Sequence, residues 1–333
     1  MAETKEKRWR RFRHRLGETR LACLCLFLFL RAMDALPLPV ARWIGRMIGR
    51  VAYVLDRGHR AVCLENLAIA FPEKTAAERR SILKKSYVHL GLCLADFCHF
   101  WSMKPEDVRE RWVVPEEGAD ARMQHALAQG QGLIAVAAHI GFWELSGFAF
   151  PPLGYPLVSV AREIRGAHID ALITRVRSRL GNAVVHQEGA LRPMLRALQE
   201  NKCIGVIMDQ HAGRDAPMVS FFSRQASTVD TVARLHMRTG APLLSNLMIR
   251  RADGRYTWRC RVLSIPPRGG ESDEEYVKVV LRECNRDFED AIREAPDQWL
   301  WMHKRWRQGG AGSADSPAPA PARKNSLQSD AQA

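Results

Sequence analysis

Short apolar runs and longer amphipathic segments alternate along the middle of the chain. The apolar runs cover residues 133–138, 157–161, 183–185, 204–208 and 243–249. The segments between them carry apolar residues at helical spacing, at 143–150, 167–180, 190–199 and 228–238. Buried strands that alternate with helices are typical of a parallel sheet covered on both faces. The pattern therefore predicts an α/β fold with a mostly parallel central sheet flanked by helices.

Further elements are predicted on both sides of this core. A capping box that begins at Thr75 precedes a helical pattern over 75–99. Two runs, 247–251 and 256–263, are joined by an Asp-Gly turn and predict an antiparallel hairpin at one edge of the sheet. A last helix is predicted over 273–294.

The N-terminus combines a basic cluster with an apolar run. Lysine and arginine dominate residues 5–15, and the apolar run 21–30 follows without a small-residue cleavage site. This run is shorter than the about 20 residues that span a bilayer. Arginines then recur at four-residue spacing, as Arg42, Arg46 and Arg50. The pattern predicts a membrane-associated helical segment. The alternative is an ordinary domain helix with a solvated arginine face.

Composition suggests three parts. Residues 1–50 are expected to form the membrane-anchoring segment and 51–308 the α/β domain. Residues 309–333 are rich in Gly, Ala, Ser and Pro, so they are expected to form a disordered tail. The net charge of +14 predicts an anionic partner, such as nucleic acid, an acidic membrane, an acidic protein or a phosphorylated substrate. We find no RNP motif or helix-turn-helix pattern, so nucleic acid is not expected.

His139 is the first candidate for chemistry. It directly follows the uniformly apolar strand 133–138, and ligands of parallel sheets bind at the carboxyl ends of strands. Gly141 permits a tight turn, and Glu144 falls in the first turn of the next helix. We expect the Glu144 carboxylate to orient the imidazole, which leaves one ring nitrogen free to act as a general base. The spacing also fits a structural histidine satisfied by a nearby acid.

Two neighbouring strand ends add polar groups. Arg162 ends the run 157–161, while Asp209 and Gln210 end the run 204–208. An arginine there can bind a phosphate, and an aspartate can hold that arginine or a substrate hydroxyl. We expect these groups to meet His139 in one crevice. The histidines and eight cysteines show no zinc-ligand spacing, and no Gly-x-Ser-x-Gly elbow is present, so neither a metal site nor a serine nucleophile is predicted.

The C-terminal segment 299–307 interleaves tryptophans with basic residues. This pattern is expected of a membrane interface or an anion-lined crevice. The alternative is a packed terminal strand or helix with a basic edge.

Several motifs together resemble the lipid A biosynthesis acyltransferases, which are lauroyl and myristoyl transferases within the wider lysophospholipid acyltransferase group. The similarity covers most of the chain before the tail. The motifs that carry it are the stretches 139–144, 206–210 with Gly213, 221–222 before Thr228, 296–306, 65–67 and 70–73, together with Arg162.

This resemblance implies an enzyme on the cytoplasmic face of a bacterial inner membrane. It would move a fatty acyl chain from acyl carrier protein to a hydroxyl of a phosphorylated glycolipid, without a cofactor. His139 would be the general base and Glu144 its partner. Arg162 would meet phosphate or the developing oxyanion, and Asp209 matches a second acid of the family.

Two alternatives stay open at this point. In the first, the enzyme catalyses the same reaction on another glycolipid, such as a phosphatidylinositol mannoside. In the second, the chain is a non-catalytic, basic membrane-binding protein. The second alternative gives no reason for His139 and Glu144 to occur together.

Overall fold

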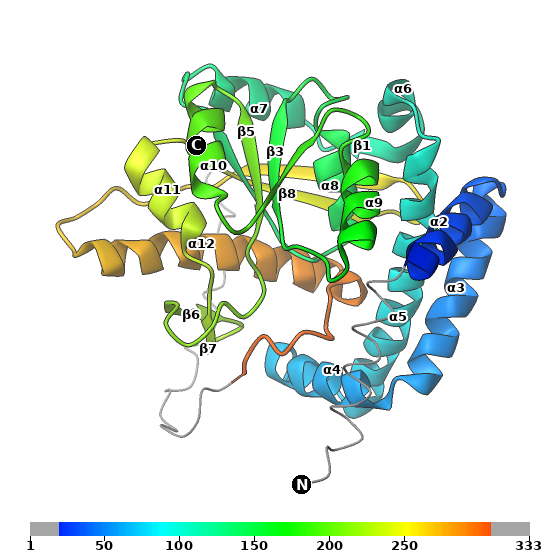
Figure 1. Cartoon of the computed structure of the whole chain (residues 1–333). Coiled ribbons are helices and arrows are strands. Elements are labelled where there is room, and N and C mark those ends of the chain that lie inside the picture. The colour runs from blue at the N-terminus through cyan, green and yellow to red at the C-terminus, as the bar shows by residue number, and fades with distance from the viewer. Residues whose placement is uncertain (1–19, 308–333) are drawn as a thin grey trace, which may run out of the picture.

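The computed structural model describes residues 20–307, and a seven-stranded sheet forms their centre (Figure 1). The strands lie in the order β1 (Val113–Pro115), β9 (Tyr256–Val262), β8 (Leu243–Arg250), β2 (Leu133–Ala137), β5 (Cys203–Ile207), β3 (Leu157–Ala161) and β4 (Ala183–His186). Strands β8, β2, β5, β3 and β4 are parallel to one another. Strand β9 is antiparallel to β8 and pairs in parallel with β1. The predicted α/β class with a mostly parallel sheet is confirmed.

Both faces of the sheet are buried at β2, as the uniformly apolar sequence of this strand requires. Ile134 and Val136 point to one hydrophobic core, and the alternating residues Leu133 and Ala135 point to the other. The first core is closed by α10 (Leu191–Gln199), α11 (Thr231–Thr239) and α12 (Asp273–Glu294). The second is closed by α7 (Ala119–Leu127), α8 (Trp143–Ala149) and α9 (Ala167–Arg177).

The N-terminal helices pack at one side of the sheet (Figure 1). They are α2 (Arg20–Asp34), α3 (Leu38–Leu55), α4 (Arg57–Ala70) and α5 (Ala76–Cys98). Helices α3 and α5 come close because glycines face each other. A Cβ atom on Gly45 would lie 2.3 Å from the carbonyl oxygen of Gly91. The predicted boundary at residue 50 therefore falls inside a packed helix, α3.

The arginine stripe of α3 is divided by this packing. Arg42 turns inward and forms an ion pair of 2.7 Å with the buried Asp96. Arg46 and Arg50 are exposed. Arg42 therefore departs from the solvated arginine face of the domain-helix alternative, whereas Arg46 and Arg50 keep solvated positions.

Short elements complete the described chain. They are η1 (His99–Trp101), α6 (Pro105–Asp107), η2 (Val108–Trp112), η3 (Pro296–Gln298) and a separate antiparallel pair, β6 (Met218–Phe221) and β7 (Arg224–Ser227). In the C-terminal segment Trp299, Trp301 and Trp306 are buried in the first core, with the Arg305 side chain fully enclosed. The three tryptophans are therefore packed inside the protein, so the membrane-interface expectation was wrong for them. The packed alternative holds only in part, because Lys304 and Arg307 form an exposed basic edge but the segment is neither a strand nor a helix.

Two local predictions can be compared directly with the structure. The capping box of α5 is present, with Thr75 and Glu78 bonded reciprocally. The β8–β9 hairpin is also present, but it is not at the sheet edge, because β1 lies outside β9. A three-residue strand has too short a pattern to be predicted from sequence.

The membrane-associated segment can be compared only in part. None of the helices within residues 20–307 is long and apolar enough to cross a membrane. The basic cluster at 5–15 and the predicted tail at 309–333 lie outside the described residues.

Candidate active site

His139 lies on a tight turn that leaves the carboxyl end of β2. Gly141 holds this turn with φ of 60°, and a Cβ atom there would lie 1.9 Å from the carbonyl oxygen of Met248. Only glycine fits this position. The backbone N–H of Gly141 donates to the carbonyl of Gln298 (2.9 Å), and that of Phe142 donates to Met248 (2.8 Å). The turn is thereby fixed against β8 and the C-terminal segment.

Asp209 binds the imidazole of His139. The ring Nδ1 of His139 lies 2.7 Å from Oδ1 of Asp209, which follows the neighbouring strand β5. The other carboxylate oxygen accepts the backbone N–H of His139 (2.8 Å) and the indole N–H of Trp299 (2.7 Å). A carboxylate on Nδ1 favours the tautomer in which Nε2 is the unprotonated nitrogen. The Gln210 amide lies 3.4 Å from that nitrogen.

The electrostatics of this pair make His139 more basic. Burial alone would lower the pKa of the imidazole, but the Asp209 carboxylate outweighs burial through its charge and its hydrogen bond, so the pKa is raised. Glu144 adds a smaller contribution in the same direction. Burial would raise the pKa of Asp209, but His139 and Trp299 together lower it. Asp209 is therefore a buried anion that stabilises the imidazolium.

Glu144 has a different partner from the expected one. Its two carboxylate oxygens accept hydrogen bonds of 2.8 and 2.6 Å from Nε and Nη2 of Arg177 on α9. The expectation that Glu144 orients the His139 ring was therefore wrong, because Asp209 occupies that position. Glu144 still contributes negative charge close to the ring.

A crevice of about 790 Å³ opens in front of His139, between the ends of β2, β5 and β3. Its apolar lining includes Ala135, Leu157 and Val206 from these strands. Cationic side chains lie around it and outnumber the acidic residues Glu144 and Asp230; they are Arg162, Arg177, Arg234 and Arg238. A crevice lined by both apolar and cationic side chains suits a ligand that has an apolar part and an anionic part.

The crevice brings together most of the predicted site residues. His139, Glu144, Arg162 and Gln210 line it, and Arg162 is exposed at the end of β3. Asp209 lies behind His139 and does not line the crevice. Gly141 shapes the turn and has no side chain to offer a ligand.

Sequence reasoning missed two residues of this site. Trp299 fixes Asp209 from a segment 90 positions later in the chain, and Arg177 fixes Glu144 across 33 positions. A signal existed for Arg177, which is a basic residue in the last turn of an amphipathic helix beside the crevice. The segment 296–306 is one of the motifs that carry the family resemblance, but nothing in it indicates that Trp299 binds Asp209, because that contact depends on how the C-terminal segment packs.

Other titratable groups nearby do not form a second catalytic cluster. His303 accepts the backbone N–H of His211 (2.8 Å), and burial lowers the pKa of His303 to about 4, so it is neutral. Within residues 20–307 no three His, Cys, Asp or Glu side chains converge as metal ligands.

Comparison with known proteins gives a consistent family. The family model described as bacterial lipid A biosynthesis acyltransferase matches residues 11–308. The lipid A biosynthesis palmitoleoyltransferase of Escherichia coli (strain K12) is 27% identical over 281 residues, which cover 84% of this chain and 89% of the relative. The lauroyltransferase of the same organism is 26% identical over 276 residues (82% and 87%), and its myristoyltransferase is 22% identical over 269 residues (80% and 79%). Because the family model covers most of the sequence, the chain belongs to the bacterial lipid A biosynthesis acyltransferases.

Proposed function

We propose that this acyltransferase moves a fatty acyl chain from acyl carrier protein to a hydroxyl of a phosphorylated lipid A precursor, with His139 as general base. The observation that carries the proposal is the Nδ1 contact of 2.7 Å between His139 and the buried Asp209, at the edge of an amphipathic crevice. This contact leaves Nε2 of His139 as the available base.

The reaction follows from this geometry. Nε2 of His139 takes the proton of the acceptor hydroxyl as the hydroxyl oxygen attacks the thioester carbonyl carbon. The tetrahedral intermediate collapses, the carbon–sulfur bond breaks, and the imidazolium returns its proton to the leaving thiolate. Asp209 stabilises the imidazolium between these two steps. Arg162 supplies positive charge at the crevice for the developing oxyanion or a substrate phosphate.

The two kinds of side chain in the crevice lining suit the two parts of the substrates. The apolar side chains from β2, β3 and β5 suit an acyl chain. Arg162 and Arg238 suit the phosphates of the acceptor, because within residues 20–307 they have no carboxylate partner, whereas Arg177 and Arg234 are already paired. Acyl carrier protein is the proposed donor because it is an acidic protein, and the net charge of +14 attracts such a partner.

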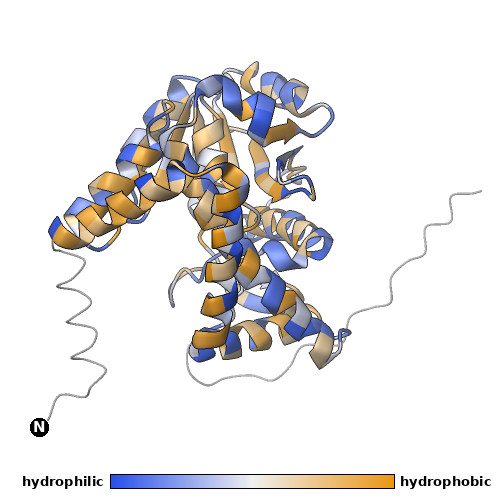
Figure 2. Cartoon of the chain, turned by 90° about the vertical axis from the view of Figure 1, so that its right-hand side faces the viewer, coloured by the Kyte–Doolittle hydropathy of each residue, from blue (hydrophilic) through white to orange (hydrophobic). Residues whose placement is uncertain are grey.

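We place the enzyme on the cytoplasmic face of the inner membrane. Support comes from apolar side chains that stay exposed on two N-terminal helices, including Leu21 (67% exposed) and Leu28 (55%) on α2 and Trp43 (58%) on α3. This part of the ribbon is coloured largely as hydrophobic in Figure 2. Exposed apolar side chains beside the exposed arginines of α3 suit the interface of an anionic leaflet.

The direct test is product analysis. The purified full chain is incubated with acyl carrier protein thioesters and phosphorylated lipid A precursors, and the lipids are analysed by mass spectrometry. We expect one acyl group to be added to the precursor. Acylation of a mannosylated phosphoinositide instead would change the acceptor, and no acylation of any glycolipid would contradict the proposed reaction.

A further inference from the structure

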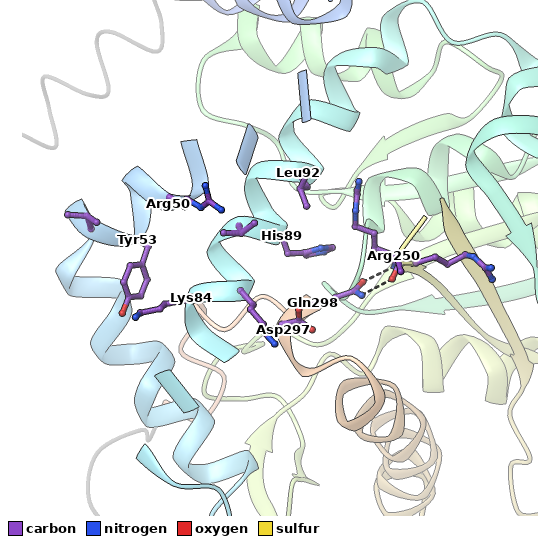
Figure 3. Close-up of a pocket in the computed structure, with 13 residues that line it drawn as sticks. Arg50, Tyr53, Lys84, His89, Leu92, Arg250, Asp297 and Gln298 are labelled. Carbon is purple, nitrogen blue, oxygen red and sulfur yellow. Dashed lines mark hydrogen bonds between the residues drawn. The ribbon is translucent and has the colours of Figure 1, made fainter. Parts of the chain in front are cut away.

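A second cavity, of about 660 Å³, is lined by residues that include Arg50, His89 and Gln298 (Figure 3). It is bounded by α3, α5, the end of β8 and the segment around Gln298, and it shares no lining residue with the crevice in front of His139. His89 separates the two regions, since its Nε2 lies 2.9 Å from the carbonyl oxygen of Gly141. Gln298 bonds the backbone of Arg250 on the other side, as the dashed lines in Figure 3 show.

Three of the cations that line this cavity have no acidic partner in the part of the chain that the structure describes. Arg50, Lys84 and Lys85 line it, and none of the three has a carboxylate within 4.0 Å among residues 20–307. Two further arginines of the lining are already paired, Arg250 with Asp96 and Arg251 with Asp253. The unpaired charges on neighbouring turns of α3 and α5 therefore suit a ligand anion.

His89 is not part of this cationic group. Burial lowers its pKa to about 4, so the ring is neutral and serves as a hydrogen-bonding wall of the cavity. Asp297 is the acidic residue of the lining. The three cations that have no carboxylate partner within the described residues outnumber Asp297, which leaves the cavity positive.

The remaining wall is apolar and continues onto the exposed surface of α3. Val54, Val88 and Leu92 line the cavity, and Val54 is 63% exposed. Next to it on α3, Val51 (56%) and Leu55 (74%) are also exposed. A soluble anion would leave this apolar surface in water, whereas a lipid would cover it with its chains.

We propose that this cavity is a binding site for an anionic phospholipid. Its phosphate would contact Arg50, Lys84 and Lys85, and its acyl chains would lie along Val54 and Val88. Because His89 and Gln298 also hold the turn at Gly141, the bound lipid would lie against the back of the catalytic turn. The site is separate from substrate binding and does not depend on the acyl transfer proposed above.

The test measures binding of a short-chain phosphatidylglycerol, below its micellar concentration, to the full chain by titration calorimetry. The double variant Lys84→Gln/Lys85→Gln should bind about tenfold more weakly, the loss expected for about 1.4 kcal/mol of lost charge contacts. The separate variant Val88→Trp, whose larger side chain fills the cavity, should abolish binding. The matched control is Arg46→Gln/Arg57→Gln, which removes the same charge from exposed residues of α3 and α4 that do not line the cavity, and it should change affinity less than about twofold.

Three comparison ligands identify what the site recognises. Short-chain phosphatidylcholine and glycerol phosphate should each bind at least about tenfold more weakly, because each offers only part of the lipid. Equal binding of phosphatidylcholine would overturn anion recognition, and equal binding of glycerol phosphate would show a plain phosphate site. If both double variants lost the same affinity for the lipid, the binding would come from general surface charge. If acyl carrier protein displaced the lipid, the cavity would be a protein-docking site. Each of these results would overturn the proposal, whether or not acyl transfer is observed.

Discussion

At the scale of single residues, His139 depends on Asp209 in three ways. The carboxylate fixes the ring through Nδ1, holds the backbone of the turn through its second oxygen, and raises the pKa of the imidazole against the effect of burial. The indole of Trp299 keeps Asp209 itself in place. A general base with a raised pKa is a stronger proton acceptor. It also becomes protonated, and so inactive, at a higher pH when the solution is acidified.

This dependence predicts the behaviour of Asp209→Asn. Without the carboxylate charge, burial lowers the pKa of His139, so the acidic limb of the pH–rate profile should move to lower pH. The plateau rate should fall on the order of 10²-fold or more, because the amide can hold the wrong tautomer. The measurement is the rate of acyl transfer across pH for both proteins. An acidic limb that stays in place would contradict the assigned pairing.

Glu144→Gln is the matched comparison for that experiment. Glu144 contributes less than Asp209 to the raised pKa of His139, so the acidic limb should move in the same direction by a smaller amount. The rate should also fall, because Arg177 would lose its ionic partner beside the crevice. A larger shift in Glu144→Gln than in Asp209→Asn would restore Glu144 as the ring partner.

From the sequence, the residues of the site could be predicted better than the hydrogen bonds between them. His139, Arg162 and Asp209 follow buried strands, and strand ends of a parallel sheet meet at one edge. That rule does not decide which carboxylate binds the ring. Glu144 was favoured because it is near His139 in sequence. Asp209 binds the ring instead, because β5 pairs with β2 and thereby brings Asp209 next to His139.

At the scale of elements, close packing of α3 on α5 depends on glycine. A Cβ atom on Gly91 would lie 2.0 Å from the carbonyl oxygen of Gly45, so any side chain there pushes the two helices apart. This contact places Arg50 of α3 and Lys84 of α5 around one cavity. The helix pair therefore shapes the second cavity as well as the fold.

Gly91→Ala should lower the free energy of unfolding by about 1–3 kcal/mol through overpacking. The matched control is Gly58→Ala in α4, where no atom lies within 4 Å of the added Cβ. That change should be neutral or stabilise by about 0.5–1 kcal/mol, because alanine favours helix. Chemical denaturation of both variants measures the difference, and equal stability would contradict the close helix contact.

The exposed apolar side of α2 predicts membrane binding. The triple variant Leu21→Gln/Leu24→Gln/Leu28→Gln should bind vesicles of anionic phospholipid on the order of tenfold or more weakly, since each leucine contributes about 1.5–3 kcal/mol when buried. Met218→Gln/Val262→Gln changes exposed apolar residues on other elements and should leave binding unchanged. Vesicle co-sedimentation is the measurement. Equal binding of all three proteins would remove α2 from the membrane contact.

Elements with long, regular patterns were predictable, and short or context-dependent ones were not. The helix after Thr75 and the strands with buried apolar runs appear close to their predicted bounds. Strand β1 was missed because three residues carry no periodicity. The aromatic C-terminal segment was assigned to an interface because tryptophan and arginine suit both interfaces and interiors, and only the packing around Phe221 and Trp306 distinguishes them.

At the scale of the whole molecule, the two cavities lie on either side of the turn that carries His139, and the second cavity is next to the N-terminal helix α3. The crevice opens at the carboxyl edge of the sheet, and the second cavity lies behind the same catalytic turn, next to α3. The excess of positive charge over the whole sequence suits acidic partners in both places. Under the proposed function, the sheet would position His139 as the base, and the helices around α3 would face a lipid surface.

The central claim is that His139 is the base for acyl transfer, and one comparison tests it most directly. His139→Ala and the control His125→Ala, an exposed histidine on α7, are assayed for acyl addition to a phosphorylated lipid A precursor, with folding checked by circular dichroism. We predict that His139→Ala loses on the order of 10²-fold or more in rate, while His125→Ala keeps the wild-type rate. A folded His139→Ala protein that transfers acyl chains at the wild-type rate would contradict the account.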